Sequence, residues 1–129
     1  MMTLLEGLKA SLATITGVAS CRIGLEESIT PDDYPLIRLV PSRADNGAAY
    51  AHRKVDLLIY FGMPIQPFDD APDAAGRVRL EKLYAALFDL EAAIITRIGQ
   101  AGGHYVETIT DEDRLETFKV MAVRCDIEG

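Results

Sequence analysis

The segment at residues 50–61 constrains the fold more than any other part of this chain. Its apolar residues Val55, Leu57, Ile59 and Phe61 fall on one face of an extended strand, because successive side chains point to opposite sides. The other face is polar at first and then apolar, in the order His52, Lys54, Asp56, Leu58 and Tyr60. The pattern predicts a strand whose first half faces solvent or a partner on one side and whose second half is buried on both sides.

Other segments predict further strands. Pro35–Val40 is rich in β-forming residues and is closed by Pro41. Residues 42–49 combine charged and small residues, which is typical of a mobile connection. We therefore expect the strands at 35–40 and 50–61 to pair as a hairpin with a long loop, and a short strand to precede them at 19–23.

Two helices are predicted from apolar residues that recur at helical spacing. The first covers residues 4–15, with Thr3 as a cap and Gly17 as its stop. The second is long, running from Asp73 or Ala74 to Gly99 after a proline-rich, acidic loop. Its apolar stripe is interrupted only by Glu91 and consists of Leu80, Leu83, Tyr84, Leu87, Ile94, Ile95 and Ile98.

Two more strands are expected at the end of the chain, over residues 105–109 and 116–127. The polar stretch 110–114 between them is typical of a hairpin loop. The resulting order of helix, strands, helix and strands predicts a single α+β domain over residues 1–129. Its sheet is expected to be mainly antiparallel, with the short N-terminal helix and the one long helix packed on it.

Composition excludes several classes of partner. Thirteen basic residues against twenty acidic ones give a net charge of −7, which disfavours binding to nucleic-acid phosphates or to anionic membranes. No apolar run approaches the roughly 18 residues of a transmembrane helix. The first residues lack a basic region and include Glu6, so we expect no signal peptide, and we expect Cys21 and Cys125 to be reduced thiols in a cytoplasm.

No catalytic, cofactor-binding or metal-ligating set is predicted, and we expect no enzyme. His52 and His104 are interpreted as surface residues, because neither has a nucleophile or an orienting carboxylate within reach on its strand. Acidic clusters at 32–33, 69–73 and 111–113 do not follow the spacing of a calcium-binding loop, and helix capping or solvated loop charge explains them more simply.

A glycine-rich stretch at residues 99–103 follows a predicted helix and precedes a predicted strand. A phosphate-binding loop requires the reverse order, strand before helix. The stretch is therefore interpreted as a helix terminator, and no nucleotide site is predicted.

The whole pattern resembles the tail terminator, or tail-completion, proteins of long-tailed bacteriophages and prophages. The likeness rests on a short first helix, the strand Tyr34–Pro41, the strand ending Val55–Phe61, the long helix and the closing hairpin with Glu116–Val123. It implies a structural homo-oligomer, usually a hexameric ring, that ends the tail tube and binds the tail tube protein and the head-completion protein. It also implies assembly in the cytoplasm of a host bacterium, a final place in the virion tail, and no enzymatic activity.

The subunit contacts of such a ring are predicted from charge. Basic residues gather around the first hairpin and acidic residues in the proline-rich loop, so one surface of a subunit can complement a different surface of its neighbour. The predicted contact residues are Arg38, Arg43, Arg53, Asp69 and Asp70.

Two alternatives share this composition and architecture. One is another head–tail connector or minor tail protein, and the other is a small-molecule-binding or regulatory α+β domain. The binding domain predicts a concave apolar pocket with convergent polar groups, whereas the ring predicts a flat protomer with complementary edges.

Overall fold

A computed structural model describes residues 2–24, 29–45, 54–65, 67–110 and 118–128. The elements, in chain order, are α1 (Met2–Ala13), β1 (Ser20–Ile23), the 3₁₀ turn η1 (Pro31–Asp33), β2 (Leu36–Asp45), β3 (Lys54–Pro64), α2 (Arg79–Gln100), β4 (His104–Thr110) and β5 (Phe118–Glu128).

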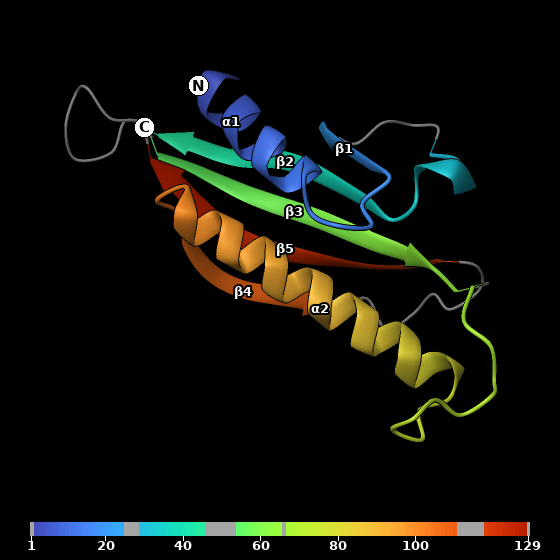
Figure 1. Cartoon of the computed structure of the whole chain (residues 1–129). Helices are drawn as coiled ribbons and strands as arrows, with labels where there is room; N and C mark the ends of the chain where they lie inside the picture. Colours follow the sequence, from blue (N-terminus) through green and yellow to red (C-terminus); the bar gives the residue numbers. More distant parts are fainter. Residues whose placement is uncertain (1, 25–28, 46–53, 66, 111–117, 129) are drawn as a thin grey trace.

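The five strands form one sheet in the order β1-β2-β3-β5-β4. Only β1 and β2 run parallel, and every other neighbouring pair is antiparallel. Figure 1 shows both helices on the same face of this sheet, with α1 over β2 and α2 over β5 and β4. The predicted α+β fold with a mainly antiparallel sheet, a short N-terminal helix and one long helix is confirmed.

The core lies between the helices and the sheet, and β3 runs through its centre. Val55, Leu57, Ile59 and Phe61 are all fully buried on the helix side, as their alternation predicted. The helices contribute the remaining apolar layer, which consists of Leu5, Leu8 and Leu12 of α1 and Leu83, Leu87, Leu90, Ile94 and Ile98 of α2. Burial on this scale is the main term that stabilises a small domain.

The long helix begins later than the sequence predicted. Asp73 does not cap α2 but closes a separate turn, because its Oδ1 accepts hydrogen bonds from the backbone N–H groups of Ala75 (2.9 Å) and Arg77 (2.8 Å). The helix starts at Arg79, where the Glu81 carboxylate accepts a hydrogen bond from the N–H of Val78. Leu80, predicted to lie in the buried stripe, falls in this first turn and is exposed.

Strand β2 is longer than predicted. Pro41 does not end it, because the ladder passes a register shift between Pro41 and Arg43 and then continues with Ala44 opposite Val55. The predicted mobile connection at 42–49 is therefore wrong for residues 42–45, and residues 46–49 lie outside the described part of the chain. Proline has no N–H to donate to the neighbouring strand. A bulge beside it leaves that position unpaired, so the ladder can continue on both sides.

The end of α2 confirms the predicted glycine-rich terminator. The N–H of Gly103 donates to the Ile98 carbonyl (2.9 Å), and the N–H of Gly102 donates to the Gly99 carbonyl (3.1 Å). Gly102 has φ +79°, the left-handed conformation that such helix ends require. Gly103 then passes so close to the sheet that an added Cβ would lie 2.7 Å from Cγ2 of Ile127.

We predict opposite effects for two glycine substitutions in this region. Gly103→Ala should lower the free energy of unfolding by about 1–3 kcal/mol, because the new methyl group overpacks the junction with β5. Gly99→Ala should raise it by up to about 1 kcal/mol, because Gly99 is helical and no atom lies within 4 Å of its added Cβ. Urea unfolding of the two variants measures both changes, and equal effects would contradict this packing.

Candidate subunit interface

The face of the sheet opposite the helices, here called the open face, has no helix over it in the described part of the chain (Figure 1). Arg38, Tyr60 and Ala122 lie side by side on it across β2, β3 and β5. An antiparallel sheet tolerates solvent on one face, but an uncovered face with apolar residues is also a surface for another chain.

One end of the open face is covered by an aromatic pair. The Tyr34 ring, just after η1, stacks on Phe118 of β5 with ring centroids 4.0 Å apart. The same ring passes over Gly62, where an added Cβ would lie 2.9 Å from it. Residue 62 must therefore lack a side chain for Tyr34 to lie against the sheet.

Arg38 is buried beneath this covered end. Its guanidinium donates hydrogen bonds to Oγ of Ser20 (3.0 Å) and to the carbonyl of Ile37 (2.9 Å), and it lies 3.9 Å from the Asp33 carboxylate. The N–H of Thr30, which donates to Asp33 at 2.8 Å, lowers the pKa of that carboxyl and keeps it ionised beside Arg38. This corrects the prediction for Arg38, which binds within the subunit and is removed from the contact residues.

The other end of the open face carries charged side chains from four strands. Lys54 and His104 both approach Asp126, at 3.9 and 3.1 Å, and Arg124 pairs with Glu107 at 3.1 Å. His104 is largely exposed, so its assignment as a surface histidine is confirmed, whereas His52 lies outside the described residues.

Arg43 belongs to this charged end. It is exposed and lies opposite Asp56 in the β2–β3 ladder. Together with neighbouring side chains it lines a shallow depression of about 440 Å³, whose other residues include Ser42, Lys54, Asp56, Leu58, Val106, Arg124 and Asp126. The position of Arg43 is thus compatible with a contact to another chain, while Arg53 lies outside the described residues.

Asp69 and Asp70 lie in the loop between β3 and α2. Asp69 accepts a hydrogen bond from Nζ of Lys82 at 2.6 Å, which lowers the pKa of its carboxyl, and Asp70 lies 3.9 Å from Nε of Arg79. Both acidic side chains remain mostly exposed. The two pairs hold the loop against the first turns of α2 and present its carboxylates at the surface.

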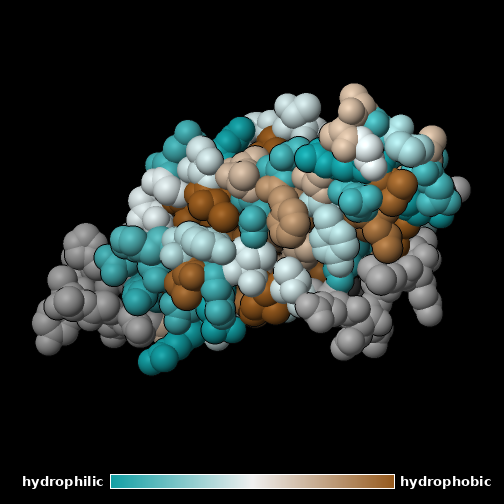
Figure 2. Space-filling model, turned by 90° about the horizontal axis from the view of Figure 1, so that it is seen from below, coloured by the Kyte–Doolittle hydropathy of each residue, from teal (hydrophilic) through white to brown (hydrophobic). Residues whose placement is uncertain are grey.

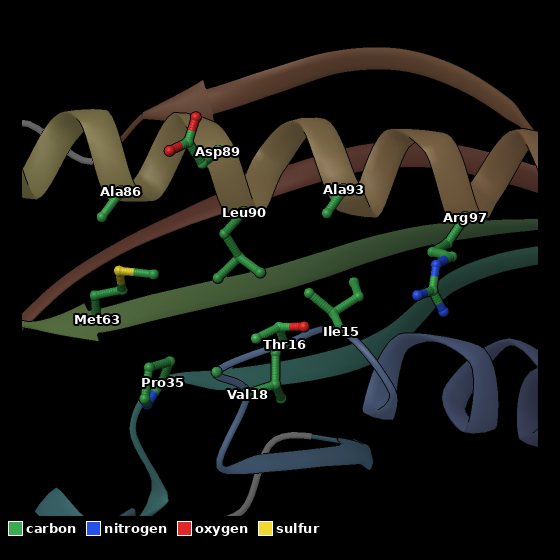
Figure 3. Close-up of a pocket in the computed structure, with 11 residues that line it drawn as sticks. Ile15, Thr16, Val18, Pro35, Met63, Ala86, Asp89, Leu90, Ala93 and Arg97 are labelled. Atoms are coloured by element: carbon green, nitrogen blue, oxygen red, sulfur yellow. The ribbon is translucent and has the colours of Figure 1, made fainter.

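A separate apolar groove of about 510 Å³ runs between the segment after α1 and α2 (Figure 3). Ile15, Val18, Met63 and Leu90 point into it, and Asp89 points away from it. Arg97, at one end, is already engaged, because it donates hydrogen bonds to Oγ1 of Thr14 (2.6 Å) and to the Ser11 carbonyl. Apart from Thr16, Asp89 and Arg97, the described residues that line the groove are apolar, so it offers few of the convergent polar groups by which small-molecule sites fix a ligand.

The two cysteines are free thiols in hydrophobic surroundings. Cys125 lies in the core, and Cys21 packs at its margin with its thiol 3.6 Å from the Lys9 carbonyl. Burial raises the pKa of Cys21 to about 11 and that of Cys125 to about 12. Both are therefore protonated at neutral pH and are poor nucleophiles.

No protein-family model matches the chain, and no curated protein is significantly similar to it. Among the described residues, no group of three or more His, Cys, Asp or Glu side chains is placed to hold a metal ion. Within the same residues, no helix has the length and apolarity needed to span a bilayer.

The raised thiol pKa values predict a loss of stability at alkaline pH. The unfolded chain releases thiol protons near pH 9, whereas the folded chain retains them to about pH 11 and 12. The folded state therefore binds more protons in this range, and the free energy of unfolding should fall as pH rises from about 9 to 11. Urea unfolding at several pH values measures the slope, and a variant with both Cys21→Ala and Cys125→Ala should show a smaller one.

Proposed function

We propose that this chain is a structural subunit of a ring that ends the tail tube of a long-tailed phage or prophage and joins the tail to the head. The observation that carries the proposal is the sheet: no helix of the described residues covers its open face, the charged end of that face exposes Arg43 and Arg124, and both edge strands lack an outer partner among the described residues. A protomer of this shape leaves surfaces that further copies can cover.

The negative charge of the chain also suits a ring through which DNA passes. Each subunit has a net charge of −7, so an assembled ring repels DNA phosphates and lets DNA pass from head to tail without binding it. At the charged end of the open face, Lys54 and Arg124 pair with Asp126 and Glu107, and such mixed charge suits contacts between subunits better than a nucleic-acid surface. The proposed location follows from this role: the host cytoplasm during assembly and the virion tail afterwards.

The small-molecule-binding alternative has less support. The groove is large enough for a small molecule. However, Arg97 already donates hydrogen bonds to Thr14 and to the Ser11 carbonyl, and the Asp89 side chain points away from the groove. Another connector or minor tail protein would share this fold, and the difference lies in what the chain binds. A terminator stops the growth of tail tubes, whereas a minor tail protein elsewhere in the tail does not.

The proposal is tested by assembly. Native mass spectrometry over rising protein concentration should detect a closed homo-oligomer, with a hexamer expected, and purified protein should arrest the elongation of tail tubes in vitro. A chain that neither self-associates nor binds tube ends would contradict the proposal. A chain that binds a metabolite as a monomer would favour the binding-domain alternative.

Charge reversal tests the predicted contacts. Arg43→Glu and Asp70→Arg should each weaken self-association, because each replaces a favourable contact with a repulsive one. Neither should change the free energy of unfolding by more than about 1 kcal/mol, since both side chains are exposed. Glu6→Arg, at an exposed position on α1, is the control and should assemble normally. Normal assembly of both variants would remove these residues from the interface.

A further inference from the structure

Strand β4 forms one edge of the sheet and is unusually apolar for an exposed strand. Tyr105, Val106 and Ile109 are 42%, 55% and 41% exposed, and in the described residues β4 pairs only with β5. The strand contains no proline and no lysine, the residues that commonly protect an edge from pairing. Figure 2, which views the molecule from below Figure 1, shows apolar side chains emerging among hydrophilic ones on this side.

The opposite edge of the sheet is β1, which pairs only with β2 within the described residues. Arg22 is exposed there and lies in register with Arg38, which places it on the open-face side of the sheet. On β4, Glu107 lies in register with Arg124 and is therefore on the same side. The two edges thus carry opposite charges on one common face.

Strand directions determine how two copies can join. Strands β1, β2 and β5 run in one direction, and β3 and β4 run in the opposite direction. Strand β4 is therefore antiparallel to β1. When copies are related by rotation about an axis along the strands, β4 of one copy meets β1 of the next in an antiparallel arrangement. The open faces of the copies then form one continuous surface.

We propose that β4 of one copy pairs antiparallel with β1 of the next, with Glu107 facing Arg22 across the junction. This inference rests on the proposed ring and names its contact. Repetition of the pairing closes the sheet, and a closed sheet has no exposed edge. Because β1 has only four residues, the backbone ladder is short, so the apolar side chains of Tyr105, Val106 and Ile109 contribute the larger part of the contact.

The test measures self-association of the full chain by sedimentation velocity and native mass spectrometry. Ile109→Lys should weaken association at least about tenfold, because it places a charge on the joining edge. Phe88→Lys is the matched control: Phe88 is similarly exposed (49%) but lies in the middle of α2, and this variant should assemble as the wild type does. Circular dichroism and thermal unfolding verify that both variants are folded.

A charge swap tests the partner strand. Glu107→Arg alone and Arg22→Glu alone should each weaken association. The double variant should recover most of the loss that arises at the junction, since it restores an opposite pair there, although it does not restore the pair of Glu107 with Arg124 within the subunit. Failure of the double variant to recover, with folded proteins, overturns the pairing of β4 with β1.

The remaining outcomes separate this inference from the proposed function. A wild-type ring that survives Ile109→Lys and Glu107→Arg overturns the edge pairing and leaves the ring in place. A wild-type dimer with two-fold symmetry indicates pairing of β4 with β4 and overturns the inference. A wild-type chain that stays monomeric, alone and with tail tubes, contradicts the proposed function itself.

Discussion

Strand β3 is the constraint on which the rest of this structure depends. It pairs along its length with both β2 and β5, and its four alternating residues Val55, Leu57, Ile59 and Phe61 are fully buried under the helices. Because side chains alternate between faces, burying this set fixes which face of the sheet the helices cover and which face stays open. The open face, and with it the position of Arg43 among the other charged side chains, follows from that one alternation.

Local patterns in the sequence were sufficient to predict the central strand and both helices. Alternation predicted β3, and helical spacing predicted α1 and most of α2, because each pattern reports burial against a single neighbouring layer. Tertiary contacts decided what the sequence misjudged. Asp73 is a good helix cap by type, yet it closes its own turn and α2 starts at Arg79, and Pro41 failed to end β2 because the ladder resumes beyond the bulge.

The candidate site was predictable only in part, for the same reason. Arg43, Asp69 and Asp70 are exposed as a contact role requires, but Arg38 is buried beside Ser20 and Asp33, and no spacing in the sequence indicates this contact. The edge positions of β1 and β4 were not predicted from the sequence, because a strand's place in a sheet depends on long-range pairing. Once the structure is known, the exposed apolar residues of β4 mark it as an edge strand, since a strand in the middle of the sheet would bury them.

We propose that copies of this chain close into a ring through the edges of their sheets. Electron microscopy of the assembled particles tests it most directly, because class averages report the symmetry without reference to any variant. We expect closed annular particles with cyclic symmetry, in which the sheet continues from one subunit to the next. Particles with only two-fold symmetry, or subunits that contact one another through α2 with the sheet edges free, would contradict it.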